Sequence, residues 1–114
     1  MVIRGMVLTD WNGHGALDGA VYQYAVSARW TPQTAGPDGS FTPLAPEDAE
    51  LLTLTQVGFR PQATATLEFP VGEHGEAPSM QTVSAAVGQW LGEQAAAMQA
   101  WVGREIALTV GAAA

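Results

Sequence analysis

The stretch from Ser79 to Val102 constrains the fold more than any other part of the sequence, because its apolar residues recur at helical spacing. On a helical wheel one arc of this stretch collects seven large apolar side chains: Val83, Val87, Trp90, Leu91, Met98, Trp101 and Val102. A helix cannot cover such an arc by itself and needs a second layer to do so. We therefore expect a long helix that packs on a sheet formed by the rest of the chain.

The opposite side of this helix carries almost no charge. Between Glu76 and Arg104 the only charged residue is Glu93, whereas a solvent-facing helix surface usually carries several charges. Small side chains recur there every four residues and form what we call the small-residue ridge: Ser84, Gly88, Gly92, Ala96 and Ala100. The ridge packs within its own subunit, merely reflects the alanine-rich composition of the chain, or forms a contact between subunits. The contact between subunits is the strongest functional prediction from the sequence.

The N-terminal part of the chain shows the patterns of antiparallel strands. Residues 2–9 and 20–30 predict a strand pair, joined by a long hairpin loop over residues 10–19 that contains an Asn-Gly and an Asp-Gly pair. Residues 62–69 alternate apolar and polar side chains, as a half-buried strand does.

The middle of the chain is rich in proline and is less regular. Residues 31–46 contain four of the seven prolines and predict a long loop. Pro46 and the two acidic residues after it favour a helix of one or two turns, followed by a strand over residues 51–57.

These elements predict one α+β domain over residues 1–114. We expect a mainly antiparallel sheet or small sandwich, with the long C-terminal helix packed on it and a final strand over residues 104–110.

The charge of the chain bears on its partners. Eleven Asp and Glu residues stand against four Arg and no Lys, which gives a net charge of −7. This balance argues against binding to a nucleic-acid backbone or to an anionic membrane. No signal peptide or membrane-spanning run is evident, so we expect a protein that is cytoplasmic when made.

The sequence supplies no catalytic signature, and we predict a non-enzymatic protein without a cofactor. There is no Cys, and no Ser lies in a nucleophile motif. His14, with Asp10 and Asp18 four residues away on either side, and His74, next to Glu73, are weak candidates for metal ligands. They would need their two loops to meet in space, and their spacing matches no metal-binding motif. We therefore predict no metal site.

In general character the chain resembles the small structural subunits of tailed-bacteriophage virions. The resemblance rests on the strand-like segments LLTLTQV and QATATLEF, the Pro/Gly-rich residues 31–46, the nearly uncharged helix and the absence of Cys and Lys. It covers the whole chain without a diagnostic motif, so it transfers no residue roles. It implies a tail, head–tail joining or capsid-associated protein in a ring or lattice, where loops and sheet edges reach other copies or other subunits.

Two other functions remain open. A small acidic protein can regulate or inhibit a partner by covering its basic surface, which would require the carboxylates to cluster on one face: Asp10, Asp18, Glu47, Asp48, Glu50, Glu73 and Glu76. A small ligand-binding or enzymatic domain would hold its pocket between helix and sheet.

Overall fold

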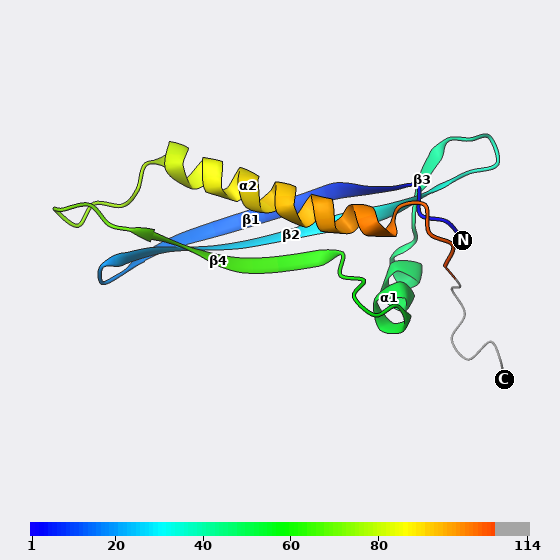
Figure 1. Cartoon of the computed structure of the whole chain (residues 1–114), viewed down its shortest axis with the longest axis horizontal. Helices are drawn as coiled ribbons and strands as arrows, with labels where there is room; N and C mark the ends of the chain where they lie inside the picture. The colour runs from blue at the N-terminus through cyan, green and yellow to red at the C-terminus, as the bar shows by residue number, and fades with distance from the viewer. Residues whose placement is uncertain (107–114) are drawn as a thin grey trace.

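The structure is an α+β fold in which a long helix lies along one face of a four-stranded antiparallel sheet (Figure 1). The computed structural model describes residues 1–106. Its elements are β1 (Gly5–Asp18), β2 (Val21–Ala35), β3 (Phe41–Pro43), α1 (Pro46–Thr55), β4 (Gln62–Pro70), α2 (Met80–Met98) and the 3₁₀ turn η1 (Gln99–Trp101). The predicted fold class is thus confirmed, with a single sheet in place of a sandwich.

Strand β2 is the centre of the sheet. One of its edges pairs with β1 along nearly its whole length, and the other pairs first with β4 and then with β3. The change of partner occurs around Pro32, which has no N–H to donate to a ladder. There Trp30 N donates to Pro61 O at 2.7 Å, and Leu44 N donates to Pro32 O at 2.8 Å. These bonds satisfy the backbone of β2 where neither neighbouring strand reaches.

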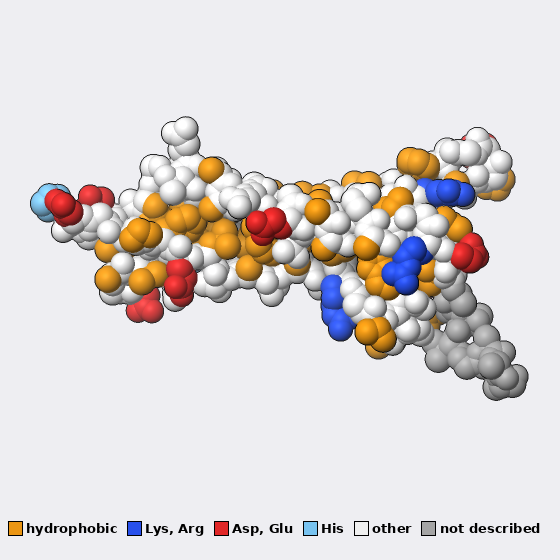
Figure 2. All heavy atoms as spheres, in the orientation of Figure 1, with side chains coloured by type: hydrophobic (Ala, Val, Ile, Leu, Met, Phe, Trp, Pro, Cys, Tyr) orange, Lys and Arg blue, Asp and Glu red, His pale blue; other side chains and the backbone are white. Residues whose placement is uncertain are grey.

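The main core lies between α2 and the sheet. Alternate residues of β2, from Tyr22 to Trp30, face the helix, and the predicted alternation of β4 is present as well. From α2 the buried residues are Val83, Val87, Trp90 and Met98. Figure 2 shows hydrophobic side chains along the seam between α2 and β4. Helix α2 begins at the Ser79 N-cap, whose hydroxyl accepts from Thr82 N, so the predicted start is confirmed; the α-helix itself ends at Met98 and η1 continues it to Trp101.

A second, smaller core closes the other end of the molecule. It is formed by buried residues from five separate segments: Ile3, Leu52, Phe59, Trp101 and Ile106. The rings of Phe59 and Trp101 meet edge to face, with centroids 5.2 Å apart. The Arg104 guanidinium covers the Trp101 ring at 4.2 Å. This cluster joins the N-terminal segment, α1 and the end of α2.

The first hairpin differs from its prediction. Strand β1 continues to Asp18, so the loop expected over residues 10–19 is a two-residue turn at Gly19 and Ala20. Gly19 is the first central residue of this turn, with φ +64, and Asp18 ends the strand before it, whereas Asn12-Gly13 remains extended. Gly13 and Gly15 lie within the strand because the rings of Tyr24 and Tyr22 occupy the space over them.

The segment after Pro46 also differs from its prediction. Residues 51–57 do not form a strand, because α1 continues to Thr55. Leu52 is fully buried in the second core, and packing there outweighs the strand preference of the threonines. The hydroxyls of Thr53 and Thr55 donate to the carbonyls of Ala49 and Leu51, four residues earlier in the helix.

The long loop expected over residues 31–46 is mostly a second hairpin. Residues 31–35 extend β2, Phe41–Pro43 form β3, and only residues 36–40 make the turn. The prolines are tolerated because Pro32 lies where β2 changes partner, Pro43 ends β3, and Pro37 and Pro46 lie in the turn and at the start of α1. The final strand expected over residues 104–110 falls largely outside the described residues. Within them, Glu105 forms an isolated bridge with Val2.

The molecule is elongated. It measures 62 × 32 × 20 Å, and its radius of gyration is 18.2 Å, against about 13 Å for a compact domain of this length. The excess arises because β1 and β2 are long strands, of 14 and 15 residues, and only one long helix covers the sheet. Much of the sheet therefore remains accessible on this chain.

Candidate assembly surface

The small-residue ridge lies on the exposed side of α2. All five of its residues are exposed, and a Cβ added to Gly88 or Gly92 would meet nothing within 4 Å. The interpretation in which the ridge packs within its own subunit is therefore wrong for the described part of the chain. The contact between subunits stays a prediction.

The outer edge of β1 is a second open surface. Among residues 1–106, β1 pairs only with β2, so its other edge presents unpaired backbone N–H and C=O groups. The register is irregular between Leu8 and Asp10 and is regular from Asp10 to Asp18. This regular segment contains neither Lys nor Pro, the residues that commonly protect an edge. Its acidic residues are Asp10 and Asp18, one at each end.

Two large apolar side chains are exposed on the regular segment of this edge strand. Trp11 is 45 % exposed and Leu17 is 56 % exposed. Trp11 lies opposite Ala28 and Leu17 lies opposite Tyr22, so both are on the face of the sheet that carries α2. Between them the Tyr24 and Tyr22 rings reach over Gly13 and Gly15. An apolar strip thus runs along the edge beside the helix.

The other face of the sheet is polar and exposed. The strand registers align side chains of β1, β2 and β4 in rows across it, such as Asp10, Arg29 and Gln62. Arg29 donates to Asp10 Oδ2 at 2.8 Å, and Ser27 donates to the side chain of Asn12 at 3.1 Å. Exposed pairs of this kind contribute little to stability, so this face is a solvated surface.

The structure does not bring His14 and His74 together. His14 lies within β1, opposite Ala25, on the polar face of the sheet. His74 lies in the loop that projects beyond the end of the sheet (Figures 1 and 2). Within residues 1–106 no three His, Cys, Asp or Glu side chains gather closely enough to hold a metal ion.

The carboxylates are not gathered on one face, as the regulatory interpretation requires. Glu73 and Glu76 lie in the loop at one end of the molecule, and Asp18 precedes the hairpin turn at that end (Figures 1 and 2). Glu47, Asp48 and Glu50 lie on α1, toward the opposite end. No observation on the described residues favours one continuous acidic surface.

One cavity lies between α1 and the middle of β2, not between the long helix and the sheet. Its volume is about 670 Å³, and its walls include Trp30, Pro46 and Leu54. Its charged groups are Arg29, Arg60 and Glu50. Because Arg29 is already paired with Asp10, the cavity carries little net positive charge.

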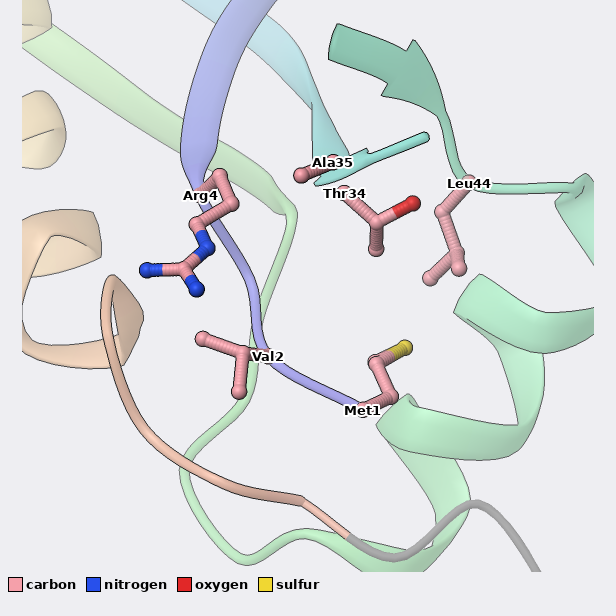
Figure 3. Close-up of a pocket in the computed structure, with 6 residues that line it drawn as sticks. All are labelled: Met1, Val2, Arg4, Thr34, Ala35 and Leu44. Atoms are coloured by element: carbon pink, nitrogen blue, oxygen red, sulfur yellow. The ribbon is translucent and has the colours of Figure 1, made fainter. Parts of the chain in front are cut away.

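A second cavity, of about 380 Å³, lies between the N-terminal segment and the end of β2. Figure 3 shows that the Arg4 guanidinium points away from Thr34 and Leu44, so the polar groups that line this cavity do not converge on a common point. A binding site usually needs a few convergent polar groups, and this depression lacks them.

Sequence reasoning missed the β1 edge because it ended the strand at residue 9. The Asp18-Gly19 pair, followed at once by a strand pattern, was the signal that places the turn there.

No helix among the described residues is long and apolar enough to cross a bilayer. Comparisons with protein-family models, with curated proteins and with solved structures find no match to this chain.

Proposed function

We propose that this protein is a non-enzymatic structural subunit that assembles with copies of itself through the free edge of β1. The observation that carries the proposal is the regular segment Asp10–Asp18, whose edge is unpaired in the described chain while Trp11 and Leu17 stand exposed on it. An open edge of this length is a template for another strand.

The shape of the molecule supports the same function. An elongated chain with a helix on one sheet face buries less of its surface than a compact domain does. Association along the sheet edge would extend the sheet and cover apolar area without rearranging the subunit. The exposed small-residue ridge offers a further flat surface on which another backbone can approach closely.

The assembly that we propose is a bacteriophage virion, as a tail, head–tail joining or capsid-associated protein. This part of the proposal rests on the resemblance in general character, and on the extended sheet and open edges that a ring or lattice requires. The protein would be made in the cytoplasm and then join the particle.

Light scattering coupled to size-exclusion chromatography tests the proposal. We expect the wild-type protein to form oligomers, and Trp11→Lys or Leu17→Lys to shift the population toward the monomer. A lysine on an edge strand opposes pairing because its charge must be desolvated.

Val57→Lys and Leu54→Lys are the matched controls. Val57 is 98 % exposed and Leu54 is 77 % exposed, and both lie outside the sheet, so the same change of charge and apolarity should leave association unchanged. A wild-type protein that remains monomeric at high concentration would contradict the proposal. Equal effects of the edge and control variants would show that general surface hydrophobicity drives association.

A second candidate function rests on the cavity at α1. Its largely apolar walls and the guanidinium group of Arg60 suit a small ligand with one carboxylate and an apolar body. Titration calorimetry with medium-chain carboxylic acids tests it: binding that Arg60→Ala abolishes would favour this function over assembly.

A further inference from the structure

We infer that the partner of the β1 edge is a second copy of β1, paired antiparallel about a two-fold axis at His14. The inference rests on the proposed function and adds the partner and the register. The two sheets would join into one continuous sheet, with both copies of α2 on the same face.

The geometry of antiparallel pairing limits the possible registers. Directly opposite residues point to the same face of a sheet. A two-fold axis perpendicular to the sheet must then lie midway between the two copies of one residue of β1, because any other position would place side chains of different faces opposite one another. The residue at the axis must therefore be one of the residues of the regular segment, Asp10–Asp18.

The position of the irregularity selects among them. The regular segment runs from Asp10 to Asp18, and His14 is its midpoint. Only an axis at His14 pairs all nine residues of this segment with their counterparts, whereas an axis at Asn12 pairs five before the irregularity intervenes. The His14 register therefore satisfies the largest number of regular backbone groups.

The same register matches the exposed apolar side chains. With the axis at His14, Trp11 of each copy lies opposite Leu17 of the other. These are the two large apolar residues exposed on the regular segment. The pairing forms two equivalent Trp11–Leu17 contacts, so both residues are covered in both copies. An axis at Asn12 would instead oppose Trp11 with Gly13. Cross-strand contacts between aromatic and aliphatic side chains favour the first arrangement.

The tyrosine rings complete the apolar strip. The His14 register places Gly13 opposite Gly15 of the second copy. The ring of Tyr24 lies over Gly13, and the ring of Tyr22 lies over Gly15. The Tyr24 ring of one copy would therefore meet the Tyr22 ring of the other copy across the junction. A side chain at either glycine would push a ring away from this position. The two glycines thus allow aromatic groups of β2 to reach the edge.

The ends of the paired segment bring Asp10 opposite Asp18 of the other copy. Two like charges oppose pairing, but Asp10 is already held by Arg29 at 2.8 Å. The guanidinium of Arg29 lies in the same row and neutralises one of the two carboxylates, so a single negative charge remains there. We therefore expect the apolar pairs to outweigh this repulsion.

Single cysteines test the register, because the natural chain has none. Residues opposite one another in an antiparallel pair have Cα atoms about 4.5–5.5 Å apart, which a disulfide can span. His14→Cys should form a disulfide-linked dimer under mild oxidation. Asn12→Cys should not, because two copies of residue 12 would be offset by four positions, about 13 Å along the strand.

Val57→Cys measures the rate of cross-linking that random collision produces, since that position is exposed and lies outside the sheet. Rapid cross-linking of His14→Cys alone supports the inference. Oligomers in which Asn12→Cys cross-links, or in which neither variant exceeds the collision rate, overturn the register but leave the proposed function standing. A protein that light scattering finds monomeric, and that does not cross-link, overturns both.

Discussion

The ring of Tyr24 lies over Gly13 of the neighbouring strand, in the place where a Cβ on residue 13 would stand. Tyr22 has the same relationship to Gly15. The two rings cover backbone that glycine would otherwise leave open, and they explain how a strand with two glycines stays regular.

This contact predicts the effect of a side chain at position 13. Gly13→Ala should lower the free energy of unfolding by about 1 kcal/mol, because the Tyr24 ring must move away from the new methyl group. Urea denaturation measures the change. In a Tyr24→Ala background the same substitution should cost much less. Gly5→Ala is the control on the same strand, since its Cβ would meet Gln33 Oε1 at an ordinary 3.8 Å.

The glycines of the small-residue ridge should respond in the opposite direction. Gly88→Ala and Gly92→Ala should each stabilise the monomer by about 1 kcal/mol, because alanine favours a helix and the added Cβ meets open space. Thermal unfolding of the two variants checks this. A loss of stability would mean that the ridge is covered within the subunit.

Larger side chains at the same positions separate folding from association. Gly88→Leu and Gly92→Leu should leave the monomer folded, because both positions are open on this chain. If the ridge is a contact between subunits, these variants should weaken association as measured by light scattering. Gln99→Leu, on an exposed position of η1 outside the ridge, is the control.

The second core should be sensitive to loss of volume. Phe59 is fully buried and packs edge to face on Trp101, so Phe59→Ala should cost about 3–5 kcal/mol. Chemical denaturation gives the value, and hydrogen exchange should show the loss of protection in α1 and η1. Val57→Ala, two residues away and almost fully exposed, should change stability very little.

The β2–β3 turn should respond to acid through Asp38. The Ser40 hydroxyl, at 2.6 Å, and the Ser40 backbone N–H, at 3.1 Å, both donate to Asp38 Oδ1 and lower the pKa of its carboxyl. A lowered pKa in the folded state stabilises the turn above the unfolded pKa of Asp, and this contribution is lost as pH falls through the folded pKa. Ser40→Ala should raise the pKa of Asp38 toward its ordinary value, which an NMR titration of the carboxyl resonance measures.

Much of the fold was predictable from local patterns. The alternation of residues 62–69 and the apolar arc from Val83 to Val102 each reflect a burial pattern that repeats with the period of one element. The errors concern segments whose burial comes from distant residues. Leu52 is helical because it packs with Phe59 and Trp101 in the second core. No pattern within residues 51–57 encodes those contacts.

By itself, the sequence determined the helix, the half-buried strand, the α+β class and the charge, because each depends on residues close together along the chain. Only the tertiary structure decided that β1 runs to Asp18, that its outer edge is unpaired in the described chain, and that the small-residue ridge is exposed. The reason is that pairing and burial are relations between segments. The presence of Gly13 and Gly15 within β1, for example, is explained only by the Tyr24 and Tyr22 rings that lie over them.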